Sequence, residues 1–267
     1  MKKWSIYFMV LLMMAGCSAR PTSSQVEISE ISMREVGLTE PLTIAEDFFP
    51  KDMNIVALGD SLTEGVGDST KRGGYLAYLE RKLLAHKAIK SVTITNLGKR
   101  GLRISKLDEV VDKNKNALQH ADMIMITIGG NDMMKVVRSH FFDLSYSLFE
   151  KEQKKFAVKL EKLLETLRSI NEDATIVLLG LYNPFGTLQA IPEIEQVIQL
   201  WNEGSKEVMD RYENTVFVEV ADLFANHDDV LYSDQFHPND LGYQLMAERV
   251  YERLEAEETL VLWIREQ

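Results

Sequence analysis

The sequence contains a single cysteine among 267 residues, and its 30 lysines and arginines are outnumbered by 41 aspartates and glutamates. One cysteine excludes an internal disulfide framework. The formal net charge of −11 argues against a nucleic-acid partner, because phosphate binding needs clustered basic side chains. It also argues against electrostatic adhesion to anionic lipid. The chain shows no internal repeat or low-complexity tract, and we expect one folded domain with appendages.

A long apolar run is also missing, since the N-terminal stretch from Trp4 to Ala15 is shorter than the about 20 residues of a membrane-spanning helix. Behind two lysines, this stretch suits the core of a secretory signal. It ends in Met14-Ala15-Gly16-Cys17, which resembles the lipobox of bacterial lipoproteins, although Met14 replaces the usual leucine. We therefore expect residues 1–16 to be a lipoprotein signal peptide. An ordinary signal peptide with an incidental cysteine, or an uncleaved anchor, is the alternative.

The lipobox resemblance implies that Cys17 carries a diacylglyceryl group and holds the protein outside the cytoplasm, at the bacterial cell membrane. The following segment, 17–50, is rich in Ser, Thr, Glu and Pro, a composition that favours a flexible tether. The alternation from Glu27 to Ile31 leaves open an edge strand there.

Residues 51–267 alternate short, buried-type strands with segments of helical periodicity. The helical segments carry apolar residues three and four apart, as at Leu76, Leu79 and Leu83, which is typical of one helix face. The alternation predicts a three-layer α/β/α sandwich with a five-stranded parallel sheet. The predicted strands are Met53 to Leu58, Ser91 to Leu97, Met123 to Ile128, Thr175 to Leu179 and Thr215 to Val220.

Polar residues and glycines follow four of these strands, at the sheet edge where parallel α/β proteins bind ligands. The segments are Gly59-Asp60-Ser61, Asn96-Leu97-Gly98, Gly129-Gly130-Asn131-Asp132, and a stretch from Asp222 to Asp234-Gln235-Phe236-His237-Pro238. The first predicts a sharp turn from Gly59 to Gly65 with Ser61 at its apex, a candidate nucleophile. Taken alone, that turn also fits a purely structural role, in which Asp60 and Ser61 bond local backbone.

These four segments, in this order, resemble the SGNH hydrolases, also called the GDSL esterase/lipase family. Ser61, Gly98, Asn131 and His237 occupy the positions of the four residues that name that family. The resemblance extends from about Asn54 to the last helix and implies a flavodoxin-like SGNH-hydrolase fold. Lys99 and Arg100 stand where relatives commonly have smaller or apolar residues, which puts the shape of the pocket in question.

The chemistry follows from the residue types. A serine hydroxyl needs a neighbouring base, and an imidazole such as that of His237 titrates near neutral pH. Asp234, three residues earlier, could fix the imidazole tautomer, as could a backbone carbonyl; the family resemblance implies that Asp234 completes the triad. The N–H groups of Ser61 and Gly98 and the side-chain amide of Asn131 are the expected oxyanion donors. Asn131 and Asp132 could instead cap a helix.

No cofactor or metal site is expected. Gly59 to Gly65 lacks the Lys-Ser/Thr of a phosphate loop, and Asp60 to Lys71 ends in lysine where a calcium loop needs glutamate. Four other histidines lack a matching ligand cluster, namely His86, His120, His140 and His227. Asp60 is expected to shape the turn around Ser61.

The expected activity is hydrolysis of a carboxylic ester, either a small-molecule ester or a lipid such as a lysophospholipid, by a monomer. A carbohydrate or cell-envelope O-acetylesterase with the same site is the alternative, and a catalytically silent binding lipoprotein is the non-enzyme alternative. Two stretches could wall an acyl groove, Met133 to Phe149 and Tyr182 to Trp201, although most of their apolar residues suit a core. The wall candidates are Phe141, Phe142, Tyr146, Phe149, Phe185, Leu188, Ile191 and Ile194.

Overall fold

The computed structural model describes residues 49–185, 193–225 and 228–260. The predicted signal peptide (1–16), Cys17 and all but the last two residues of the predicted tether (17–50) lie outside these ranges. Among the helices within them, none combines the length and the apolar character that a bilayer span requires.

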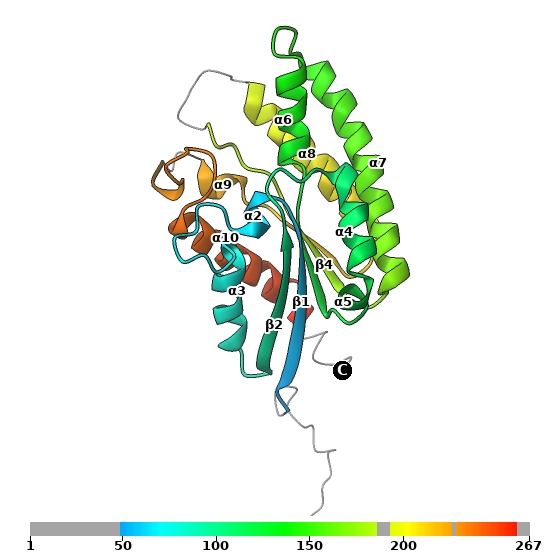
Figure 1. Ribbon diagram of the computed structural model, residues 1–267, viewed down its shortest axis with the longest axis vertical. Helices are drawn as coiled ribbons and strands as arrows, with labels where there is room; N and C mark the ends of the chain where they lie inside the picture. Colours follow the sequence, from blue (N-terminus) through cyan, green and yellow to red (C-terminus); the bar gives the residue numbers. More distant parts are fainter. Residues whose placement is uncertain (1–48, 186–192, 226–227, 261–267) are drawn as a thin grey trace, which may run out of the picture. The chain divides into compact units, whose positions relative to one another are not determined.

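Five parallel strands form one sheet in the order β2-β1-β3-β4-β5, which confirms the predicted fold class (Figure 1). This order matches the doubly wound flavodoxin-like arrangement, in which β1 lies beside the point where the strand order reverses. The strands are β1 (Lys51–Gly59), β2 (Ile89–Gly98), β3 (Met123–Thr127), β4 (Thr175–Leu179) and β5 (Thr215–Val218).

Helices cover both faces of the sheet (Figure 1). One face packs against α3 (Tyr75–Leu84), α9 (Ala221–Phe224) and α10 (Asp240–Ala256). The other packs against α4 (Leu107–Lys113), α5 (Lys115–Gln119), α6 (Gly130–Ser139), α7 (Tyr146–Ile170) and α8 (Glu193–Met209). Short elements complete the described part: α2 (Ser61–Glu64), η2 (Ile104–Lys106) and η3 (Asp228–Val230). Because each face buries apolar side chains, both hydrophobic clusters stabilise the sheet between them.

The prediction that all five strands are buried is wrong for β2. Between Ser91 and Leu97 every residue is at least partly exposed, because β2 lies at the sheet edge and has β1 as its neighbour on one side alone. β1, flanked by β2 and β3, is buried from Ile55 to Gly59. A run of valines and isoleucines therefore predicts a strand but not its position in the sheet.

The strand register brings the carboxyl ends of all five strands level. Gly59 pairs with Gly98 on one side and Thr127 on the other. Thr127 pairs with Leu179, which pairs with Val218. The segments that leave these strands therefore meet at one edge of the sheet, where the candidate site lies.

Candidate active site

The turn after β1 is a short helix with a cap at each end. Asp60 Oδ1 accepts from the Leu62 N–H at 3.1 Å, and Gly65 ends α2 with a left-handed φ of 88°. Ser61 is the first residue of α2, so its N–H is one of the donors that intrahelical hydrogen bonding leaves over. The local backbone role expected for Asp60 is therefore confirmed, and the turn presents Ser61, which is 6% exposed, at the end of β1.

A buried hydroxyl network beneath this turn was not predicted from the sequence. Thr63 Oγ1 lies 2.7 Å from Thr127 Oγ1, and the Thr127 hydroxyl donates to Asp60 Oδ1 at 3.0 Å. The Asp60 N–H donates to the Thr127 carbonyl at 3.1 Å. The network joins the turn to the end of β3, and the one sequence signal for it is that Thr127 closes an otherwise apolar strand.

Burial raises the pKa of the Asp60 carboxyl to about 6, against the opposing effect of hydrogen bonds from the Leu62 N–H and the Thr127 hydroxyl. Since the pKa is higher in the folded chain than the ordinary 3.8, the folded state holds its proton more tightly than the unfolded state. The contribution of Asp60 to stability is thus full below about pH 4 and is lost as the pH rises through about 6.

Asp60→Asn should therefore gain stability relative to the wild type as the pH rises from 4 to 7. At about 1.4 kcal/mol per pKa unit, and with part of the effect already lost by pH 4, the difference in unfolding free energy should shift by about 2 kcal/mol in favour of the variant. Urea unfolding of both proteins at several pH values measures this shift. The change with pH is the readout, because any cost of the buried asparagine amide is independent of pH. A constant difference would contradict the raised pKa.

His237 is held between Asp234 and Ser61. His237 Nδ1 lies 2.6 Å from Asp234 Oδ2, and Nε2 lies 2.9 Å from Ser61 Oγ. Because a carboxylate can only accept, we assign the ring proton to Nδ1, which leaves the Nε2 lone pair facing the hydroxyl. The structure thus brings together the three residues expected to react.

Asp234 is positioned by the backbone of its own loop. Its Oδ1 accepts from the N–H groups of Phe236 and His237, both at 3.0 Å. Burial acts to raise the pKa of this carboxyl, but hydrogen bonds from the His237 N–H, the His237 ring and the Phe236 N–H outweigh burial, and the pKa lies below its ordinary value. Asp234 is therefore charged at neutral pH.

Tyr182, at the exit of β4, supports the histidine loop. Its hydroxyl donates to the Phe236 carbonyl at 2.7 Å, and its ring stacks on Phe224 with centroids 3.8 Å apart. The Tyr232 N–H also donates to the His237 carbonyl at 2.7 Å. His237 itself is 5% exposed, so its ring has little freedom to leave Ser61.

Asn131 is the second residue of α6, which is capped by Gly129 with a φ of 116°. The alternative that Asn131 caps this helix is therefore wrong. Its Nδ2 donates to the Leu102 carbonyl at 3.1 Å, which fixes the amide and leaves one Nδ2 hydrogen over. The adjacent Asp132 accepts from the Ile104 N–H at 3.0 Å. Both side chains hold the loop that follows β2.

Gly98 ends β2 next to α2, but its N–H donates to Asn96 Oδ1 at 2.9 Å. A Cβ on Gly98 would lie 2.2 Å from the Glu64 nitrogen, so the two backbone segments approach each other closely at this position. The neighbour is the α2 backbone, and the sequence did not predict the role of Asn96, whose Nδ2 also donates to the Thr63 carbonyl at 2.7 Å.

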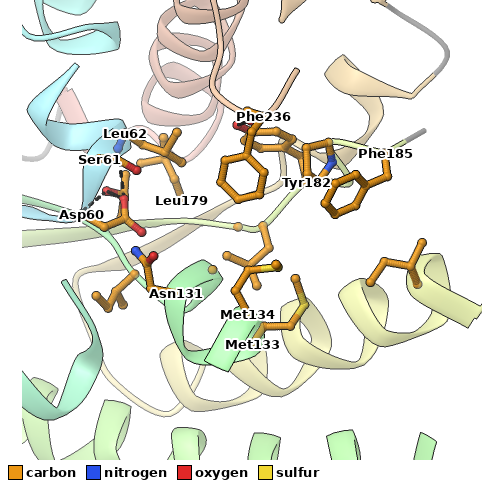
Figure 2. Close-up of a pocket in the computed structure, with 17 residues that line it drawn as sticks. Asp60, Ser61, Leu62, Asn131, Met133, Met134, Leu179, Tyr182, Phe185 and Phe236 are labelled. Carbon is orange, nitrogen blue, oxygen red and sulfur yellow. Dashed lines mark hydrogen bonds between the residues drawn. The ribbon is translucent and has the colours of Figure 1, made fainter. Parts of the chain in front are cut away.

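An apolar pocket opens beside Ser61 (Figure 2). Figure 2 shows Ser61 and Asn131 toward one end and Tyr182 and Phe185 toward the other. The volume of this pocket is about 50 Å³. The other lining residues include Leu62, Ile128, Met133, Met134, Leu179, Leu181, Pro184, Ile194 and Phe236.

The wall stretches predicted from the sequence contribute only in part. Phe185 and Ile194 line the pocket beside Ser61. Phe149 belongs to the core and also lines a second pocket, described below, whereas Phe141 and Phe142 are 68% and 99% exposed. Tyr146 lines the same second pocket. Leu188 and Ile191 lie outside the described residues.

The remaining candidates do not enter the first pocket. Lys99 and Arg100 are exposed and are absent from its lining. The loop after α2 is likewise absent, because Asp68 folds it back by accepting from the N–H groups of Thr70, Arg72 and Gly74. Within the ranges that the structure describes, no cluster of three or more His, Cys, Asp or Glu side chains could hold a metal ion.

The remaining acidic and histidine candidates lie elsewhere. Asp222 pairs with Arg249. Of the other histidines, His86 Nδ1 accepts from the Ala88 N–H, His120 Nδ1 lies 2.8 Å from the Asn116 carbonyl, and His140 lies 3.6 Å from Asp143. His227 lies outside the described residues.

Comparisons with known proteins show the family of the chain. Residues 57–245 match the model of the GDSL-like Lipase/Acylhydrolase family. The chain is 32% identical to the uncharacterized protein YpmR of Bacillus subtilis (strain 168), over 95% of this chain and 96% of that protein. It is 28% identical to the spore germination lipase LipC of Bacillus licheniformis, over 76% of this chain and 99% of that protein.

A solved structure shares the fold. The lipase Lip_vut3 from a goat rumen metagenome superposes with a TM-score of 0.68 at 24% identity, covering 75% of this chain and 97% of that one. The family match includes the turn at Ser61, the start of α6 and the histidine loop. The chain therefore belongs to the GDSL-like lipase/acylhydrolase family and is a hydrolase of ester bonds.

Proposed function

We propose that the chain is a serine esterase that hydrolyses acyl esters, such as lipid or lysophospholipid esters, through a covalent acyl-enzyme on Ser61. The observation that carries the proposal is the continuous chain of contacts from Ser61 Oγ through His237 to Asp234, at 2.9 and 2.6 Å, beside an apolar pocket. The similarity to a spore germination lipase supports the choice of a lipid ester.

In the first half of the reaction, Ser61 Oγ attacks the ester carbonyl carbon while His237 Nε2 takes the hydroxyl proton. Asp234, charged at neutral pH, stabilises the imidazolium that forms. His237 then donates this proton to the departing alkoxide, the carbon–oxygen bond breaks, and the alcohol leaves. In the second half, water attacks the acyl-enzyme with His237 as base, and the acid is released as Ser61 regains its proton.

The oxyanion of the tetrahedral intermediate needs donors next to Ser61. Two groups would donate to the oxyanion. They are the Ser61 N–H, at the start of α2, and the Nδ2 hydrogen of Asn131 that is not bonded to the Leu102 carbonyl. The Gly98 N–H becomes a third donor on exchanging its bond to Asn96 Oδ1 for one to the oxyanion. Because the bond from Asn131 to Leu102 fixes the amide in advance, its donation costs little reorganisation.

Hydrolysis of a p-nitrophenyl acyl series, beside acetylated sugars, tests this function. We expect p-nitrophenyl butyrate and longer esters to be better substrates than acetylated xylo-oligosaccharides. A preference for the sugars would favour the O-acetylesterase alternative with the same triad. Absence of all hydrolysis, with no label from a fluorophosphonate, would leave the binding-lipoprotein alternative.

The anchor belongs to the same proposal and is supported by the lipobox-like Met14-Ala15-Gly16-Cys17. Cleavage before Cys17 and its lipidation would hold the hydrolase outside the cytoplasm at the cell membrane. Wild-type protein expressed in a Gram-positive host should incorporate labelled palmitate and sediment with membranes, and Cys17→Ser should do neither. Equal labelling of both would refute lipidation at Cys17.

A further inference from the structure

A second apolar pocket, of about 130 Å³, lies next to the pocket beside Ser61. Ile194, in the first turn of α8, lines both. The second pocket is formed where α6, the start of α7 and the start of α8 converge, and its lining is Val137, Leu144, Ser145, Tyr146, Phe149, Glu193, Ile194 and Val197. Six of these eight side chains are aliphatic or aromatic.

One face of α6 connects the two pockets. Met133 and Met134 line the first and Val137 lines the second, and residues three and four apart lie on the same side of a helix. From Asn131 to Val137 the helix rises about 9 Å, roughly the length of an octanoyl chain. Methionine side chains adapt their shape readily, so the boundary between the pockets can follow a bound chain.

The volumes indicate how the two pockets divide a substrate. The first is the smaller, at about 50 Å³, and admits a short acyl group beside Ser61. A longer chain held at Ser61 must continue beyond it, and the second pocket, at about 130 Å³, offers more space. Leu144 and Tyr146 at its rim are 37% and 45% exposed, so the far end reaches solvent.

We infer that the second pocket binds the distal part of an acyl chain whose ester carbonyl lies at Ser61, and that the preferred substrates are esters of medium and long acyl chains. This inference rests on the proposed esterase function and names its substrate class. Burial of methylene groups against the apolar walls makes the binding free energy of a long acyl chain more favourable. An acetyl group ends before it reaches Val137 and does not benefit from this burial.

Val137→Trp tests the inference, because the indole would fill the second pocket and leave Ser61 and its partners untouched. We expect kcat/KM for p-nitrophenyl decanoate to fall by about tenfold or more, with that for p-nitrophenyl butyrate within about twofold of wild type. The matched control is Val158→Trp, at a position on α7 that is 66% exposed and lines neither pocket. It should leave the ratio of the two rates unchanged.

An unchanged decanoate-to-butyrate ratio in folded Val137→Trp would overturn the inference. If that variant fails to fold, Leu144→Trp narrows the same pocket from its exposed rim and is expected to lower the same ratio; an unchanged ratio there has the same meaning. Failure of the wild type to hydrolyse either ester would be a distinct outcome, since it removes the proposed function itself and this inference with it.

Discussion

Replacing Ser61 with alanine should lower kcat for ester hydrolysis by about 10⁶-fold, the loss typical of a serine hydrolase without its nucleophile. The hydroxyl is the atom that lies 2.9 Å from His237 Nε2, so its loss leaves the base with nothing to deprotonate. Folding should be preserved, because Asp60 and Gly65 cap α2 without the Ser61 side chain. Steady-state rates on p-nitrophenyl butyrate measure the loss.

A fluorophosphonate probe gives an independent readout of the same change. We expect one covalent label per wild-type chain, mapped to Ser61 by mass spectrometry, and none on Ser61→Ala. Ser169→Ala is the matched control, since Ser169 lies on α7 and its hydroxyl donates to the Thr166 carbonyl. Labelling of Ser61→Ala at the wild-type rate would show that another residue is the nucleophile.

Asp234→Asn should reduce kcat by about 10⁴-fold. The asparagine Oδ1 can still accept from the N–H groups of Phe236 and His237, so the loop should keep its shape. The amide nitrogen, however, would replace the oxygen that lies 2.6 Å from His237 Nδ1. As a donor it would favour the tautomer with the proton on Nε2, which cannot accept the proton of Ser61.

A structural and an electronic role of Asp234 can be separated. Circular dichroism and thermal unfolding should be close to wild type for Asp234→Asn, while labelling by fluorophosphonate slows in parallel with kcat. Asp222→Asn provides the control, because Asp222 forms an ion pair with Arg249 on the surface, where such pairs contribute little. Full activity in Asp234→Asn would assign the orientation of His237 to other groups.

The strands and the candidate site residues could be predicted from the sequence because each carries a local signal. An apolar run such as Met123 to Ile128 predicts a strand whatever surrounds it, and a glycine-bounded turn after such a run predicts a serine, here Ser61, at the apex of that turn. The pairing of Ser61 with His237 required more, namely the rule that carboxyl ends of parallel strands meet. The order of neighbouring strands, and with it the exposure of β2, has no local signal.

The supporting network could not be predicted for a different reason. Thr63 and Thr127 are ordinary threonines in the sequence, and only the register that sets Gly59 opposite Thr127 brings their hydroxyls together. Gly98 shows a related limit, since its position was predicted but the partner of its N–H was not. Asn96 Oδ1 accepts that N–H because the asparagine lies two residues earlier on the same edge strand, where its side chain can turn back.

The contact between Ser61 and His237 joins positions 176 residues apart, with four of the five strands in the intervening chain. Closing so long a loop is late and slow, because the contacts that reward it are themselves non-local. A chain emerging from the ribosome or a secretion channel N-terminus first therefore exposes its serine before any base is near it. Recovery of hydrolysis after dilution from urea therefore reports that the whole sheet has formed. The nascent enzyme is inactive until the C-terminal fifth of the chain, which carries His237, has folded against the rest.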